Sequence, residues 1–278
     1  PAANTSFFAI LLGSDNGGTI TPTDASVTTA KIAADNVTPP KTNFFNTDPG
    51  NAADLGMLHI KSGDSGASVS STSDELVIEG SSVGMSFLDA TDGATRIAFG
   101  DSGDNDIGKI VYGHSSNQME FVTNTATGLV IDGSGHVTKP LQPAFSVRSN
   151  ATQSNVASNT LILFGAEIYD IGSNFASDHT FTAPVTGKYQ LNAIVRMDNL
   201  DSSGTWVAMT IQTSNRNYGV LNSASTLDTD SGYWTFTLSC LADMDANDTA
   251  NILFNKSGGS DTGDATDSAA LFSGFLAC

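Results

Sequence analysis

The stretch Tyr233-Trp-Thr-Phe-Thr-Leu-Ser-Cys240 decides the fold class of the second half of the chain. Large apolar residues occupy every second position in it: Trp234, Phe236, Leu238 and Cys240. A two-residue period is typical of a β-strand that buries one face and exposes the other. Residues 189–195 alternate in the same way, and residues 206–211 form a further apolar run. Several long strands of this kind predict a β-sandwich.

The composition extends this prediction to the whole chain. There are 25 Asp against 4 Glu, together with 27 Gly. Asp and Gly favour turns and caps, whereas Glu favours helix interiors, so we expect an all-β protein with many polar turns. The net charge of −18 includes only 11 Lys and Arg residues, with no basic cluster. Such a surface repels phosphate and anionic lipid, so we expect neither a nucleic-acid partner nor membrane insertion.

Pro140 and Pro143 mark the main boundary in the chain. Proline favours an extended connection and biases the preceding residue away from helix. We therefore predict three parts: an N-terminal attachment segment over residues 1–45, a β-repeat shaft over residues 46–139 and a globular head over residues 140–278.

The shaft region repeats a short apolar run followed by a Gly, Asp or Ser turn. Its five runs are Leu76–Gly80, Arg96–Gly100, Lys109–Gly113, Met119–Val122 and Leu129–Gly133. Alternation pairs apolar residues on one face: Ile97 with Phe99, Ile110 with Tyr112, Met119 with Phe121, and Leu129 with Ile131. The spacing of roughly ten residues is typical of a meander, a solenoid or an intertwined shaft. Each unit is too small to bury its own apolar face, so association between repeats or between three chains is expected to cover it.

The first segment contains one apolar run, formed by Phe7, Phe8, Ile10, Leu11 and Leu12. The run is far shorter than the ~20 residues of a membrane-spanning helix, and no basic residue precedes it, so we do not interpret it as a signal peptide. We expect synthesis in a bacterial host cytoplasm and assembly into a virion. The run is our candidate for attachment to other virion proteins, on capsid or tail, and a flexible leader is the alternative.

Spaced aromatic residues in the head resemble a known family. The run Phe164-x5-Asp170-x4-Phe175, followed by Phe181-x5-Gly187-x-Tyr189 and by the terminal Phe272-Ser-Gly-Phe-Leu276, resembles the signature of the complement C1q domain. The resemblance covers residues from about Phe145 to the C-terminus. It implies a C1q-like, tumour-necrosis-factor-like jelly roll that forms homotrimers around a hydrophobic axis.

The first half resembles a different group of proteins. The stretches Ser26–Ile32, Phe99–Ile110 and Leu129–Val137 are similar to segments in the fibre proteins of tailed bacteriophages. This resemblance implies a virion fibre in place of a secreted C1q-like lectin.

The sequence offers no arrangement of residues that would support catalysis. The four histidines lie in turn-like stretches without metal-binding spacing, and nucleophile elbows, phosphate loops and dinucleotide fingerprints are missing. We therefore expect no enzyme activity.

Calcium is the one cofactor that the acidic loops suggest. The candidate ligands are Asp198, Asp201, Asp228 and Asp230, with Asp261, Asp264 and Asp267 as further candidates. Three-fold symmetry would bring each Asp close to its copies, where Ca²⁺ relieves repulsion; solvated loops are the alternative. The acidic stretch Asp101–Gly108 lacks the later Glu of a calcium loop and is interpreted as a β-turn.

Recognition by such a head would come from its loops, because its strands are committed to the core and to trimer contacts. The candidate loops cover residues 198–205, 222–232 and 257–268. Within them, the candidate receptor-binding residues are Asn199, Asp201, Ser225, Asp228, Asp230 and Asp261. These polar residues suit hydrogen bonding to a host-surface glycan or protein.

We thus predict a trimeric fibre of a tailed phage with a receptor-binding C1q-like head. A capsid decoration or head-fibre protein with a structural role and no receptor is the alternative. Cys240 and Cys278, the only cysteines, are expected to be free thiols.

Overall fold

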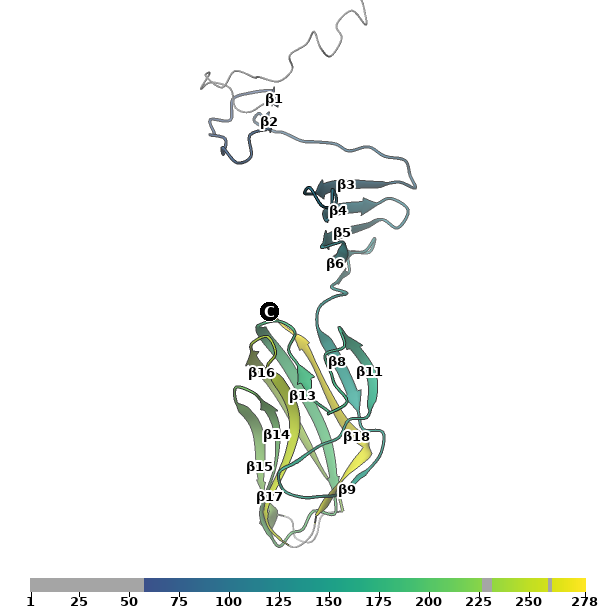
Figure 1. The fold of residues 1–278 in the computed structure, drawn as a ribbon, viewed down its shortest axis with the longest axis vertical. Coiled ribbons are helices and arrows are strands. Elements are labelled where there is room, and N and C mark those ends of the chain that lie inside the picture. Colours follow the sequence, from purple (N-terminus) through teal and green to yellow (C-terminus); the bar gives the residue numbers. More distant parts are fainter. Residues whose placement is uncertain (1–57, 227–231, 260–261) are drawn as a thin grey trace, which may run out of the picture. The chain divides into compact units, whose positions relative to one another are not determined.

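The computed structural model describes residues 58–226, 232–259 and 262–278 of the chain (Figure 1). The predicted attachment residues Phe7 to Leu12 therefore lie outside the described part, as do Asp228, Asp230 and Asp261. The chain divides between Ser86 and Phe87 into two compact units. Within the described residues, no helix has the length and apolar character that a membrane crossing requires.

The first unit contains two short parallel strands, β1 (Leu58–Lys61) and β2 (Leu76–Glu79). The run beginning at Leu76 was expected to belong to the same repeat as the later runs, but it pairs with β1 instead. Fourteen residues separate Glu79 from Ala94, the start of the next strand, which is too long for the hairpin turns that join the later repeats.

A buried carboxylate closes the loop between β1 and β2. Glu79 is 6% exposed, and its Oε1 accepts hydrogen bonds from the Ser65 backbone N–H (2.8 Å) and hydroxyl (3.1 Å). Its Oε2 lies 2.9 Å from His59 Nε2 and 3.2 Å from Lys61 Nζ. The Ser65 N–H bond is the main cause that lowers the pKa of Glu79 to about 2, with Lys61 acting in the same direction.

The remaining repeats form an antiparallel meander within the second unit. Its strands are β3 (Ala94–Phe99), β4 (Gly108–Gly113), β5 (Gln118–Thr123), β6 (Ala126–Ile131) and β7 (Val137–Thr138), hydrogen-bonded in chain order. Ile97 lies opposite Ile110, Ile110 opposite Phe121, and Phe121 opposite Leu129. The predicted apolar face is therefore continuous across the sheet.

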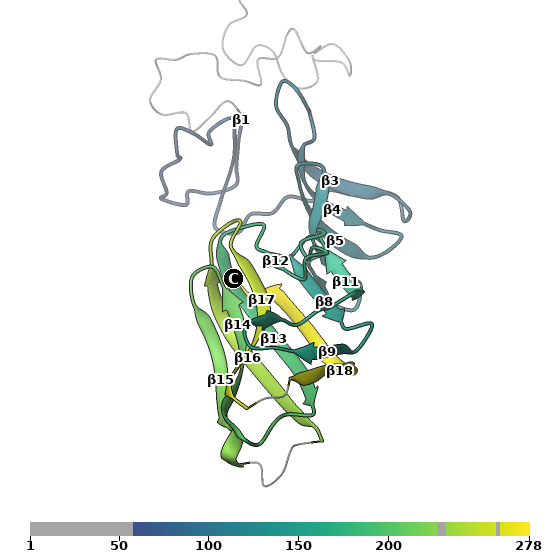
Figure 2. The same ribbon diagram turned by 60° about the horizontal axis from the view of Figure 1, so that its bottom comes forward.

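The head is a sandwich of two antiparallel sheets (Figures 1 and 2). In the described residues, one sheet has the order β11-β8-β18-β13-β16, with β9 also paired to β18. The other has the order β10-β17-β14-β15, with β12 also paired to β17. The strands of the first sheet are β8 (Ala144–Arg148), β9 (Gln153–Val156), β11 (Ala166–Ile171), β13 (Gly187–Asp198), β16 (Trp234–Met244) and β18 (Gly263–Leu276). Those of the second are β10 (Thr160–Leu161), β12 (Phe181–Thr182), β14 (Gly204–Thr213), β15 (Asn217–Ser223) and β17 (Thr249–Gly258).

This strand order confirms the all-β prediction and the jelly-roll expectation. The first and last strands of the head, β8 and β18, lie side by side, so the sandwich is closed by strands far apart in sequence. On β13, Tyr189, Leu191, Ala193 and Val195 are each at most 1% exposed, as the two-residue period predicts.

The aromatic residues quoted from the sequence meet in the core between the sheets. Phe145 stacks on Phe181 with ring centroids 4.5 Å apart and meets Phe272 edge-on at 5.0 Å. Phe175 packs against the same rings, at 5.4 Å from Phe145 and 6.2 Å from Phe272. Asp170 fixes the turn before Phe175 by accepting hydrogen bonds from the backbone N–H groups of Asn174 (3.0 Å) and Phe175 (2.8 Å).

A glycine in the last strand lets this cluster close. A Cβ added at Gly274 would lie 2.6 Å from Leu191 Cδ2 and 2.9 Å from Phe145 Cε1. Contacts of that length do not occur between real side chains, so the Gly of the terminal Phe272-Ser-Gly-Phe stretch is required by packing.

The β16 prediction can be tested by a matched pair of substitutions. Phe236 is 1% exposed, whereas its neighbour Thr235 is exposed. Phe236→Ala should lower the free energy of unfolding by about 3–5 kcal/mol, because it leaves a cavity in the core. Thr235→Ala should change it by less than about 1 kcal/mol. Chemical denaturation measures both, and equal losses would contradict the assigned strand faces.

The Glu79 site predicts a pH dependence for the first unit. The folded-state pKa of about 2 lies below the ordinary value of 4.5, so the ionised carboxylate stabilises the loop above about pH 4.5. That stabilisation should be lost as the pH falls toward 2. The amide NMR shift of Ser65, which donates to Glu79, should titrate with a midpoint near 2 and stop responding in Glu79→Gln. Glu75→Gln, at an exposed side chain, is the control. A midpoint near 4.5 in the unchanged protein would refute the buried geometry.

Candidate functional site

The predicted binding loops converge at one end of the head. β13 ends at Asp198 and β18 begins at Gly263, and Asp198 pairs with Asp264 there. β14 begins and β17 ends at the same place, where Gly204 pairs with Gly258. A Cβ at Gly204 would contact Ala224, in the loop of residues 222–232, at 3.4 Å. We call this the loop end; its described members are residues 199–203, 224–226, 232–233, 259 and 262.

The chain enters and leaves the head at the opposite end. Leu276 N–H donates to Pro143 O (2.9 Å), and Lys188 N–H donates to Cys278 O (2.7 Å). Lys188 lies at the beginning of β13, where Tyr189 pairs with Leu276, and the far end of this strand leads into the loop end. The strands of the sandwich therefore separate the loop end from the connection to the meander, and Figure 1 shows the C-terminus at the end away from the loops.

Asp264 holds two segments of the loop end together. Its Oδ2 accepts a hydrogen bond from Asn199 Nδ2 (3.0 Å), and its Oδ1 accepts one from the Asn155 backbone N–H (2.8 Å). Thr262 Oγ1 adds a bond to Asn155 Oδ1 (3.0 Å). Asn155 and Asn199 both adopt positive φ, 58° and 57°, a conformation that Asn tolerates better than most residues.

Asn155 belongs to a fourth segment that the sequence reasoning missed. Residues 153–156 form β9, which pairs with the beginning of β18, and Ser158 Oγ donates to Lys256 O (2.9 Å). The segment has little apolar character, so no periodicity revealed it. The usable signal was its Asn and Ser content, which is typical of turns that accept positive φ.

The described calcium candidates Asp198 and Asp201 accept hydrogen bonds from other groups of the protein. Arg196 Nε and Nη2 donate to Asp198 Oδ1 (2.7 Å) and Oδ2 (2.8 Å), so the Asp198 carboxylate is paired with a cation. Asp201 Oδ1 accepts the Ser203 backbone N–H (2.8 Å) and shapes its own turn. In the described part of the chain, no group of three or more His, Cys, Asp or Glu could hold a metal ion. Calcium binding that involves Asp228, Asp230 or Asp261 stays a prediction.

The described receptor candidates differ in accessibility. Asn199 and Ser225 are exposed, and Asp201 is half-buried. Ser225 Oγ lies 2.8 Å from Ser223 Oγ. Leu200, next to Asn199, and Ala224, next to Ser225, are buried, with exposed fractions of 1% and 0%. They anchor their loops to the sandwich. The loop end thus presents hydrogen-bonding groups on anchored backbone, which suits a polar ligand.

The outer face of the β11-β8-β18-β13-β16 sheet is a second candidate surface. Strand register places three rows across it: Leu241, Gln190, Phe275, Ala144 and Ile171; then Ser239, Asn192, Ser273, Ser146 and Tyr169; then Thr237, Ile194, Leu271 and Arg148. Large apolar side chains stand exposed in it, including Leu241 (55%), Phe275 (47%) and Ile194 (40%). Arg148 is the only charged residue in these three rows, and the next positions on the same face carry the ion pairs Lys188–Asp243 and Arg196–Asp198. We call this surface the open face.

A small polar network lies on the open face between its apolar rows. Gln190 Nε2 donates to Ser239 Oγ (2.9 Å) and to Asn192 Oδ1 (3.1 Å), and Ser239 Oγ donates to Asn192 Oδ1 (2.9 Å). The three side chains are joined through Gln190 Nε2, Ser239 Oγ and Asn192 Oδ1, which leaves Gln190 Oε1 and Asn192 Nδ2 outside the network. A partner that covers this surface would therefore have to hydrogen-bond the remaining amide oxygen and amide nitrogen.

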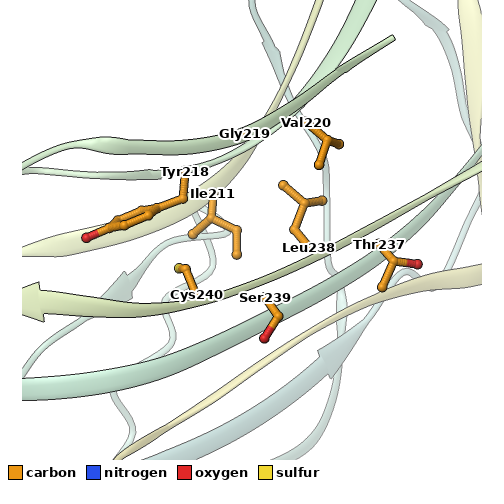
Figure 3. A pocket seen from close by; sticks show the side chains of 8 residues that line it. All are labelled: Ile211, Tyr218, Gly219, Val220, Thr237, Leu238, Ser239 and Cys240. Carbon is orange, nitrogen blue, oxygen red and sulfur yellow. The ribbon is translucent and has the colours of Figure 1, made fainter.

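A cavity of about 370 Å³ opens between the edge strands β15 and β16 (Figure 3). Ile211, Leu238 and Val220 contribute apolar walls, and Cys240 points toward it. Burial raises the pKa of the Cys240 thiol to about 11. The protonated thiol is a poor nucleophile, so this cavity has the character of a packing gap between the sheets. Cys240 and Cys278 are both free, as expected.

Comparison with known proteins bears on the head. Residues 144–277 match the model of the C1q domain. No curated protein matches the sequence. Among solved structures, the chain is similar to the globular domain of zebrafish complement 1qA protein, at 17% identity and a TM-score of 0.39 over 49% of this chain and 98% of that one.

Two further solved structures cover the same share of this chain. Murine APRIL is 9% identical, with a TM-score of 0.37 over 49% of this chain and 98% of that chain. Eiger TNF from S. frugiperda is 10% identical, with a TM-score of 0.39 over 49% of this chain and 94% of that chain.

The family match and the strand order agree on the same residues. The matched range begins at the first residue of β8 and ends one residue beyond β18. Residues 144–277 therefore match the C1q-domain model and have a jelly-roll fold.

Proposed function

We propose that the chain is a homotrimeric structural protein of a tailed-phage virion, whose C1q-like head recognises a host-surface glycan or protein through its loop end. The observation that carries the proposal is the position of the loop end, across the sandwich from the chain's connection to the meander. Because the meander joins the head at the opposite end, the loop end would point away from any virion protein that binds the N-terminal part of the chain.

Homotrimer formation is supported by the open face. C1q-like domains form homotrimers, and the three rows of the open face combine exposed apolar side chains with a hydrogen-bonded polar group and only one charged residue, Arg148. The charged residues beyond these rows on β13 and β16 form ion pairs, Lys188 with Asp243 and Arg196 with Asp198. Depletion of charge and exposure of large apolar groups are typical of surfaces that are buried on association. Three heads side by side would point three loop ends in one direction.

The virion assignment is supported by the similarity of residues 26–32, 99–110 and 129–137 to phage-fibre segments. In this proposal the apolar run from Phe7 to Leu12 attaches the trimer to other virion proteins. Three weak contacts made by one trimer act together, because the second and third contacts are intramolecular. The loops can therefore bind with modest affinity per site.

The binding claim is tested with two matched substitutions in the full chain. Asn199 and Asn215 are both exposed, and each donates its side-chain amide to a carboxylate: Asn199 to Asp264 (3.0 Å) at the loop end and Asn215 to Asp248 (2.8 Å) at the opposite end. Asn199→Gly keeps the positive φ accessible and removes the amide. A loss of about 1 kcal/mol per contact, repeated three times, should lower retention on host cells by about 10²-fold. Asn215→Gly should leave retention unchanged.

Retention on cells is measured by sedimentation with labelled protein, and antibody labelling in electron micrographs locates the chain on virions. If the unchanged protein ignores host cells while labelling appears on capsids, receptor binding is refuted and the chain acts as a capsid decoration. If virions carry no label, the phage assignment itself fails.

A further inference from the structure

The meander presents one face that is apolar along its whole width. Register places nine large apolar side chains on it: Ile97, Phe99, Ile110, Tyr112, Met119, Phe121, Leu129, Ile131 and Val137. No charged residue lies on this side of the sheet. The opposite side carries Arg96, Lys109 and Glu120. We call the first side the apolar meander face.

Among the residues that the structure describes, none forms a second layer over this face. Phe99 is 57% exposed, Val137 58%, Ile97 41% and Phe121 39%. In the described part of the chain, no strand outside β3–β7 joins this sheet, and no meander residue belongs to the hydrophobic core cluster of the head. A sheet with one apolar face must bury that face against another layer, so the described meander lacks its second layer.

The apolar meander face leads into the open face of the head. Val137, which pairs with Ile131 at the edge of the meander, lines a cavity of about 400 Å³ together with Ala144, Ile171 and Phe275. These three belong to the first apolar row of the open face. Lys139 and Gln142 complete the lining, and Gln142 Nε2 donates a hydrogen bond to Leu276 O. Apolar surface therefore continues from one sheet to the other across the short connection.

We infer that the apolar meander face is covered by the same face of two further copies of this chain, so that three meanders pack together as a continuation of the head trimer. The inference rests on the proposed homotrimer. Residues 139–143 tether each meander to its head, so trimerised heads would hold three apolar meander faces at high effective concentration. A face without charges is also self-complementary, because no like charges meet when copies of it are packed together.

Cysteine cross-linking in the full chain tests this inference. Ile110 and Val111 are neighbours on β4, both half-buried and both apolar, but they lie on opposite faces of the sheet. Each is replaced by Cys in a Cys278→Ser background, which removes the exposed native thiol. A short bis-maleimide should cross-link Ile110→Cys between copies several-fold more efficiently than Val111→Cys, because only position 110 faces the other copies.

The mass of each variant is measured first, by sedimentation equilibrium without cross-linker. A monomeric unchanged chain would refute the homotrimer itself. A trimeric chain in which positions 110 and 111 cross-link equally, or in which neither does, would refute packing through the apolar meander face while leaving the head trimer intact. If Ile110→Cys alone dissociates the trimer, the substitutions Leu129→Cys and Val130→Cys repeat the comparison on opposite faces of β6.

Discussion

The structure depends on one constraint: a β-sheet with an apolar face must have that face covered. In the head, two sheets satisfy it for each other, and Phe145, Phe181 and Phe272 meet in the space between them. Gly274 lets the last strand approach closely enough for those rings to pack. The constraint is left unsatisfied on the open face of the head and on the apolar meander face. In the homotrimer that we propose, association between copies of the chain would cover both at once.

The same constraint places the proposed contacts between copies on the strands and the proposed recognition of a ligand on the loops. Strand faces are used for the core and, in the proposed trimer, for contacts between copies, so polar loops are the parts left to vary. The loop end is anchored by buried residues such as Leu200 and by the bonds of Asp264, while Asn199 and Ser225 remain exposed. A rigid scaffold with exposed polar groups lowers the entropy lost when a ligand binds.

Much of the head could be predicted from sequence because its strands are long and strictly alternating. The face of β16 that carries Phe236 and Leu238 is buried as predicted, and Tyr189 to Val195 follow the same rule. The pairing partner of the Leu76 run could not be predicted, since a four-residue apolar run specifies a strand but not its neighbour. Asn155 was missed because hydrogen bonds between distant loops leave no periodic pattern. The Arg196–Asp198 ion pair could not be predicted. Its two residues lie two positions apart on one strand, and many charged residues have that spacing without forming a pair.

The central claim is that this chain is stable only as a trimer whose uncovered sheet faces are buried against one another. Sedimentation equilibrium of the unmodified full chain across a wide concentration range tests it most directly. The account predicts a single species of three times the 28.7 kDa chain mass, persisting on dilution. A cooperatively folded monomer at 28.7 kDa would contradict it.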